Sequence, residues 1–199
     1  MKLYGGTLDK ISIDTLHLEG TKHLTLIDMP SIDLRNVFET LPELQTFFVR
    51  NVDEFKKENF MAVYRRFISY SGLETLGLEL LPFDLTDVSS EFLQIIQFHS
   101  NSLKHLYIGR NKVPSSLLKE ICNKLMGGLQ VLETIDLTHA KESSKIDWVD
   151  TFKDIAKLSA QGRVQPIIVR VSDYQTTLKR ADIYKYLEDH KPNIEVQFV

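Results

Sequence analysis

The stretch LKHLYIGRN, residues 103–111, decides how the chain can fold. Apolar residues stand at its first, fourth and sixth positions, as Leu103, Leu106 and Ile108, and an amide, Asn111, stands at its ninth. Side chains of a strand alternate between its two faces, so the fourth and sixth positions turn toward the same side. We expect a short strand whose apolar side chains enter a core, followed by a turn that contains Asn111.

The same apolar pattern recurs at a nearly constant interval. Its first position falls at residues 44, 73, 103, 132, 164 and 193, so successive copies lie 29–32 residues apart, with Asn193 replacing the apolar residue in the last. The other fourth and sixth positions are Phe47 and Val49, Leu76 and Leu78, Ile135 and Leu137, Ile167 and Val169, and Val196 and Phe198. A period of roughly 20–50 residues indicates a solenoid of stacked units. The alternative is an α/β domain whose strands and helices are unrelated.

Helical patterns separate these strands. Leu34, Val37, Phe38 and Leu41 have the i, i+3, i+4, i+7 spacing of an apolar helix stripe, and Pro42 ends that segment. The same period predicts helices over residues 54–70, 89–98, 115–125, 147–158 and 176–187. Strands that alternate with helices predict an α/β fold with a parallel sheet.

The N-terminal region departs from the period. Two alternating apolar runs, at residues 11–18 and 24–27, are joined by Glu19-Gly20-Thr21 and leave no room for a helix between them. This spacing predicts a hairpin or a pair of short strands, and a hairpin here could cap the first unit. We therefore expect one domain over residues 1–199, with an irregular cap at 1–43 and about five to six units over 44–199.

Composition narrows the class of protein. The 199 residues carry a net charge of −3, which gives no general attraction to nucleic acid or to anionic membranes. The lone cysteine, Cys122, lies in a helical pattern, where we expect a small buried residue in a reducing compartment. Neither a secretory signal nor an apolar run of membrane-spanning length is present in the sequence, so we expect a cytoplasmic or nuclear protein.

These strand patterns resemble those of leucine-rich repeat proteins. The long period and helical return segments are similar to the ribonuclease-inhibitor-like and the cysteine-containing, F-box-partner subfamilies. The resemblance implies a parallel concave sheet with helices on the convex side. The chain departs from the family at the ninth position, where only the Leu103 copy has asparagine. The equivalent residues are Val52, Leu81, Ala140 and Ser172.

The resemblance also implies that the third, fifth and seventh positions project from the concave sheet. These positions are Thr46, Phe48, Arg50, Thr75, Gly77, Glu79, His105, Tyr107, Gly109, Thr134, Asp136, Thr138, Pro166, Ile168 and Arg170. The candidate partner-binding residues among them are Phe48, Arg50, Glu79, His105, Tyr107, Asp136, Ile168 and Arg170. Aromatic side chains on an open sheet are typical of a protein interface. The alternative is a solvated strip in which a loop shields Phe48.

The sequence shows no recognisable catalytic or cofactor motif. His17 and His23 could meet across a hairpin, but a third ligand at suitable spacing is missing. Gly5-Gly6 and Gly127-Gly128 lack the residues of a phosphate loop. Basic pairs at residues 56–57 and 65–66 fit the polar face of a helix. We expect no enzyme, no cofactor, no metal, no small-molecule substrate and no nucleic-acid ligand.

The main hypothesis is a non-catalytic module that holds another protein on its concave sheet. One alternative is the substrate-recognition fragment of an F-box-type ubiquitin ligase receptor, although the sequence has no F-box. Another is a GTPase-activating protein on the same scaffold, which would need an exposed arginine or asparagine at the rim. Arg110 and Asn111 are the candidates, and Asn111 is also explained by its turn.

Overall fold

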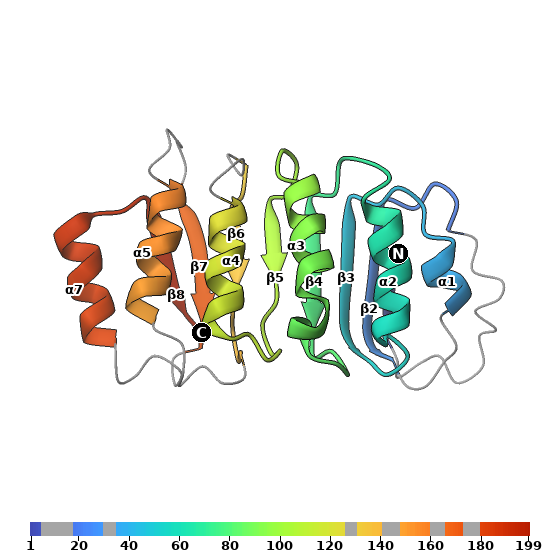
Figure 1. Cartoon of the computed structure of the whole chain (residues 1–199), viewed down its shortest axis with the longest axis horizontal. Coiled ribbons are helices and arrows are strands. Elements are labelled where there is room, and N and C mark those ends of the chain that lie inside the picture. The colour runs from blue at the N-terminus through green and yellow to red at the C-terminus, as the bar shows by residue number, and fades with distance from the viewer. Residues whose placement is uncertain (5–17, 30–34, 126–130, 141–147, 160–165, 173–179) are drawn as a thin grey trace.

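The computed structural model describes residues 1–4, 18–29, 35–125, 131–140, 148–159, 166–172 and 180–199 (Figure 1). The strands among them form one sheet in chain order, and every neighbouring pair is parallel. They are β1 (Lys2–Tyr4), β2 (His23–Met29), β3 (Thr46–Val52), β4 (Thr75–Glu79), β5 (His105–Tyr107), β6 (Thr134–Asp136), β7 (Ile167–Val171) and β8 (Ile194–Phe198). The predicted α/β class with a parallel sheet is confirmed.

Helices connect successive strands and lie in a row on one side of the sheet, in chain order (Figure 1). They are α1 (Arg35–Glu39), α2 (Lys57–Phe67), α3 (Ser89–Phe98), α4 (Ser115–Leu125), α5 (Trp148–Ser159) and α7 (Arg180–His190), with a 3-10 turn, η3 (Leu85–Val88), before α3. Each helix covers its own part of the sheet, which gives the chain a solenoid-like order. None of the helices in the described ranges is long and apolar enough to cross a membrane.

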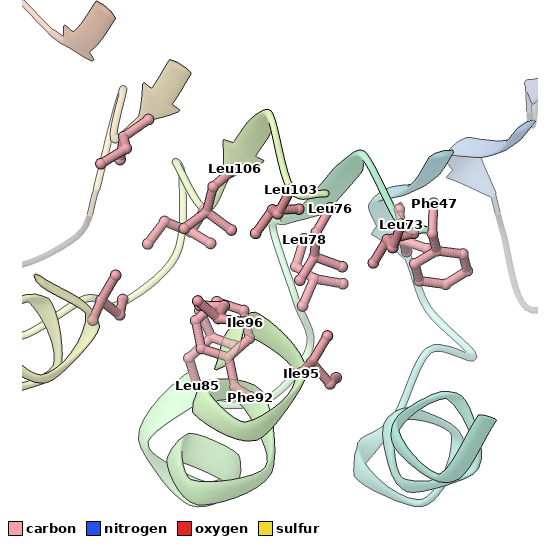
Figure 2. Close-up of a cluster of buried hydrophobic side chains, with 14 of the residues drawn as sticks. Phe47, Leu73, Leu76, Leu78, Leu85, Phe92, Ile95, Ile96, Leu103 and Leu106 are labelled. Carbon is pink, nitrogen blue, oxygen red and sulfur yellow. The ribbon is translucent and has the colours of Figure 1, made fainter. Parts of the chain in front are cut away.

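The core lies between the sheet and the helices. The fourth-position side chains stand side by side in register and are fully or almost fully buried. They are Leu24, Phe47, Leu76, Leu106, Ile135 and Val169. In Figure 2 the strand leucines point toward Phe92, Ile95 and Ile96 of α3, which close the layer from the other side. No unit could bury this row alone, so each depends on its neighbours.

A left-handed residue occurs at one fixed position of the pattern, inside the end of β2 and β3 and just after β4, β5 and β6. The residues with this conformation, at the eighth position of the pattern, are Asp28, Asn51, Leu80, Arg110 and His139, with φ between 49° and 62°. Non-glycine residues enter this region at a cost, and leucine and arginine do so less readily than asparagine or aspartate. The repeat is therefore visible in the backbone even where the side chains differ.

Asn111 bonds as the pattern predicts. Its Nδ2 donates to the carbonyl oxygens of Ile108, at 3.2 Å, and Leu78, and its Oδ1 accepts from the Leu81 N–H at 3.0 Å. One amide thus ties the turn after β5 to the turn after β4. Ser172, directly after β7, has a comparable role, because its Oγ accepts from the N–H of His139, in the turn after β6, at 2.6 Å.

The predicted N-terminal hairpin is wrong. β2 pairs with β1 on one side and with β3 on the other, and both pairings are parallel. Leu24 aligns with Phe47 and Leu26 with Val49, so β2 belongs to the repeating sheet. Parallel strands need a connection of about a dozen residues or more, and residues 5–22 provide it. The first run of the expected hairpin lies mostly at residues 11–17, outside the described residues.

The predicted frame of the β7 unit is wrong by two residues. Val169, and not Ile167, pairs with Ile135 and holds the fourth position. The interval from Ile135 to Val169 is 34 residues and the next, to Val196, is 27, so the 29–32 range fails here. A shift of two residues leaves the same side chains facing the core, which is why alternation alone could not fix this register.

Two buried polar side chains form hydrogen bonds to the backbone at the first position of a unit. The Tyr70 hydroxyl donates to the Leu44 carbonyl oxygen and accepts from the Leu44 N–H, both at 3.0 Å. One unit later, His99 Nδ1 accepts from the Leu73 N–H at 3.3 Å, and Nε2 lies 2.8 Å from the Phe67 carbonyl oxygen, to which it donates. This pair of bonds requires a neutral ring. Burial lowers the pKa of His99, consistent with the same state.

We expect His99→Gln to weaken the pH dependence of stability. Between pH 7.5 and 5.5 the unfolded chain, with a histidine pKa near 6.5, takes up a proton that native His99 resists, so the wild type loses stability as pH falls. Glutamine should cost roughly 1–3 kcal/mol at pH 7.5 and less at pH 5.5. Urea unfolding at both pH values measures the difference. His190→Gln, at an exposed histidine, is the control, and equal slopes for wild type and His99→Gln would contradict the assignment.

Candidate functional site on the open face of the sheet

The strand register arranges three rows of side chains on the face opposite the core and helices, here called the open face. The first row is His23, Thr46, Thr75, His105, Thr134, Ile168 and Glu195. The central row is Lys2, Thr25, Phe48, Gly77, Tyr107, Asp136, Arg170 and Gln197, and the third begins Tyr4, Ile27, Arg50, Glu79. All eight candidate residues of the sequence analysis lie in these rows.

An aromatic pair occupies the centre of the open face. Phe48, Gly77 and Tyr107 lie on three adjacent strands in one register line. The rings of Phe48 and Tyr107 meet edge to face across the glycine, with centroids 5.8 Å apart and planes at 68°. A Cβ at residue 77 would overlap Cδ2 of Phe48. Glycine therefore leaves the space through which the Phe48 ring reaches Tyr107, and each ring partly shields the other.

His105 extends this aromatic pair toward the first row. Its ring centroid lies 6.3 Å from that of Tyr107, and Nε2 lies 3.9 Å from a carboxylate oxygen of Glu133. Its Nδ1 is buried and has no hydrogen-bond partner among the described residues. Buried polar atoms are usually satisfied, so this nitrogen is a feature that packing alone does not explain.

Glu79 is the least expected side chain of the open face. The residue is only 6% exposed, and it makes no hydrogen bond and no ion pair within 4 Å in the described part of the chain. Burial raises the pKa of Glu79, and the negative charge of Asp136 raises it further, while Arg50 and Arg110 act against both. Placing a carboxylate here costs stability unless something compensates its charge.

Asp136 is buried at 8% exposure and is only partly satisfied. Its Oδ1 accepts from the Thr138 N–H at 3.0 Å and from the Thr138 hydroxyl at 2.7 Å. Its Oδ2 lies 4.0 Å from Nη1 of Arg170, whose Nε donates to Gln197 at 3.1 Å. Arg170 therefore divides its guanidinium between two acceptors, and Asp136 has one oxygen with only a distant partner.

The two acids and Arg170 act electrostatically on Tyr107. Burial raises the pKa of Tyr107, Arg170 lowers it, and Asp136 and Glu79 each raise it. Arg50 bounds the site on the β3 side, where Nη2 lies 3.7 Å from Asp28. The centre of the open face thus combines an aromatic pair with two acids, and one arginine stands at each end.

The remaining predicted positions contribute less. Ile168 lies beside Thr134 at the margin of the site, because of the two-residue register shift. A Cβ at Gly109 would overlap the carbonyl oxygen of Thr138, so these two residues pack turn against turn. The sequence analysis missed Gln197, which orients Arg170, because nothing in its own strand indicates that contact.

Among the described residues, no cluster of three or more histidine, cysteine, aspartate or glutamate side chains could hold a metal ion. His17, one of the two histidines considered for a metal, lies outside them. Comparison of the chain with protein-family models, with curated proteins and with solved structures found no significant match.

Gly77→Ala should disturb the aromatic pair. Because the new Cβ overlaps the Phe48 ring, we expect a loss of roughly 1–3 kcal/mol in the free energy of unfolding. In a Phe48→Ala background the obstacle is gone, and the same change should be neutral or slightly stabilising, since alanine suits a strand interior better. Urea unfolding of the four proteins gives the coupling energy. An equal cost of Gly77→Ala in both backgrounds would rule out the proposed overlap.

Glu79→Gln should stabilise the protein at pH 7 by on the order of 1–3 kcal/mol, because it removes a buried, unpaired charge. The pKa of native Glu79 is raised, so the folded chain binds a proton before the unfolded chain does. Wild-type stability therefore rises as pH falls toward the unfolded value, and the advantage of glutamine shrinks. Chemical unfolding at pH 7 and 4.5 tests this.

Glu74→Gln is the matched control for that experiment. Glu74 directly precedes β4 and is partly exposed, with a carboxylate oxygen 2.9 Å from Nζ of Lys104. Removing one partner of an exposed pair should change stability by less than about 1 kcal/mol. If Glu79→Gln proves destabilising at pH 7, the carboxylate has a compensating partner in the free protein and the argument is wrong.

Proposed function

We propose that this chain is a non-catalytic leucine-rich repeat module that holds a partner protein on the open face of its sheet. The observation that carries the proposal is the Phe48–Tyr107 pair at the centre of that face. Interface cores are enriched in aromatic residues and arginine, and a few such side chains supply most of the binding energy. Here the aromatic pair is flanked by Arg50 and Arg170, a composition that suits such a core.

Three features support the leucine-rich repeat assignment. The apolar pattern of Leu103–Asn111 recurs, the strands are parallel with helices on one side, and a left-handed residue recurs at the same register position. Asn111 ties neighbouring turns together as the amide of such a pattern would. Curved repeat surfaces commonly serve as extended binding surfaces.

The two alternatives gain less support. Asn111 is buried at 4% exposure and its amide is bonded to neighbouring turns, so it is a poor candidate for a catalytic group of a GTPase-activating protein. Arg110 lies in a left-handed turn and acts on the charge of Glu79. The ubiquitin-ligase alternative stays a prediction, for which co-purification with an Skp1-like adaptor is the test.

The proposal is tested by affinity capture with wild type and Phe48→Ala/Tyr107→Ala as baits, read by mass spectrometry. Loss of two interface anchors should weaken binding of the true partner by about 2–4 kcal/mol, or some 30- to 1000-fold. The partner should therefore disappear from the double variant. The isolated partner is then titrated against both proteins by calorimetry.

Phe98→Ala/Tyr184→Ala is the control bait. It removes two exposed aromatic side chains from the helices α3 and α7, 48% and 43% exposed, and leaves the open face intact. Circular dichroism confirms that each bait is folded. Binding that survives loss of Phe48 and Tyr107 but not loss of Phe98 and Tyr184 would move the interface to the helical side and contradict the proposal.

A further inference from the structure

Two acids of the open face differ in how the described residues satisfy them: Asp136 accepts two hydrogen bonds from Thr138, and Glu79 accepts none. Glu79 has neither a hydrogen bond nor an ion pair among these residues, and Oδ2 of Asp136 has only Arg170, at 4.0 Å. Glu79 is 6% exposed, and the side chain of Asp136 is 11% exposed. Buried carboxylates are normally hydrogen-bonded or paired with a cation. An arrangement that leaves Glu79 without a donor, close to a second acid, is suited to receiving a donor from outside.

The position of the two acids defines where such a donor would lie. Glu79 is on β4 and Asp136 on β6, and Tyr107 is on the strand between them. Neighbouring strands are about 4.8 Å apart, so a group above the Tyr107 ring stands roughly one strand spacing from each acid-bearing strand. Both acids act electrostatically on Tyr107, which agrees with this placement.

None of the three nearby arginines, Arg50, Arg110 and Arg170, makes an ion pair with Glu79. Arg50 lies 3.7 Å from Asp28, and Arg170 donates to Gln197. Arg50 and Arg110 both act on Glu79, but neither lies within ion-pair distance of it. Two acids and three arginines thus share this part of the open face, and Glu79 is the acid that none of the arginines reaches within 4 Å.

We propose that the partner inserts a lysine or arginine side chain between Glu79 and Asp136, against the Tyr107 ring. This inference rests on the proposed function. The cation would pair with the carboxylates, and its hydrocarbon stem would pack on the aromatic pair Phe48–Tyr107. A guanidinium could also stack on the ring and present two parallel N–H groups to one carboxylate. Acidic residues beside the basic one would complement Arg50 and Arg170.

The aromatic surroundings favour a side chain over a metal ion. A bound metal needs several oxygen or nitrogen ligands in a closed shell, and the described residues contain no cluster of three or more acidic, histidine or cysteine side chains. A phosphate-rich ligand would meet the negative charges of Glu79 and Asp136 at the centre of the site. A basic side chain satisfies the carboxylates and uses the aromatic surface at the same time.

The test uses a phage-displayed library of random 12-residue peptides, selected in parallel on four baits. The baits are wild type, Glu79→Gln/Asp136→Asn, Phe48→Ala/Tyr107→Ala and the control Phe98→Ala/Tyr184→Ala. Wild type and the control should enrich peptides with lysine or arginine at one shared position. Glu79→Gln/Asp136→Asn should not select that residue, and circular dichroism checks that it is folded.

A selected peptide is then synthesised with its basic residue and with norleucine in its place. Loss of the charge should weaken binding to wild type about tenfold or more, and binding to Glu79→Gln/Asp136→Asn less than about twofold, as expected for a direct charge pair. Equal losses on both proteins would overturn the inference, because the basic residue would then bind elsewhere.

The outcomes separate this inference from the proposed function. Peptides that need Phe48 and Tyr107 but share no basic residue would overturn the inference and leave the open face as the binding surface. Peptides that bind all four baits equally, or no enrichment on wild type, would count against both. A shared basic residue selected by wild type and the control, and lost with Glu79 and Asp136, is the expected result.

Discussion

The whole structure depends on one apolar side chain per strand standing beside its equivalent in the next. This line is buried between the sheet and the helices. It consists of Phe47, Leu76, Leu106, Ile135 and Val169. Because parallel strands are hydrogen-bonded side by side, the line fixes the register of the entire sheet. Every alternate residue is then fixed on the open face. The contact of Phe48 with Tyr107, and the closeness of Glu79 to Asp136, both follow from the packing of the opposite side.

The sequence predicts this packing well, and the contacts of the open face poorly. The strand and its inward side could be predicted from Leu103, Leu106 and Ile108, because apolar residues that face a core alternate along a strand. The same spacing recurs along the chain, which predicted the repeat. The β7 register escaped prediction because Ile167 and Val169 are both apolar and face the same side. The hairpin was predicted because its two runs are close in sequence, whereas the partner of β2 is the distant β1. The Phe48 ring occupies the space that a side chain at residue 77 would fill. This contact depends on the alignment of three strands, so it could not be predicted from the sequence of any one of them.

The open face combines groups that stabilise and groups that do not. The aromatic pair lowers the free energy of the folded chain, whereas the carboxylate of Glu79 raises it. Binding sites commonly contain such unpaired charged groups. A ligand that pairs with the group removes an unfavourable free energy that is already present in the free protein, and binding is stronger for that reason. The raised pKa of Glu79 is the measurable sign of that cost. Stability and binding therefore make opposite demands on this residue.

The left-handed residue that ends successive strands has a further consequence. It recurs at the same register position at Asp28, Asn51, Leu80, Arg110 and His139, whatever length of chain follows. Fourth-position residues are 23 residues apart between Leu24 and Phe47 and 34 apart between Ile135 and Val169, yet both pairs are direct neighbours in the sheet. Insertions on the helical side are thus absorbed without altering the spacing of the open face. The two sides of the fold can diverge independently, with loop lengths free to vary while the binding surface keeps its geometry.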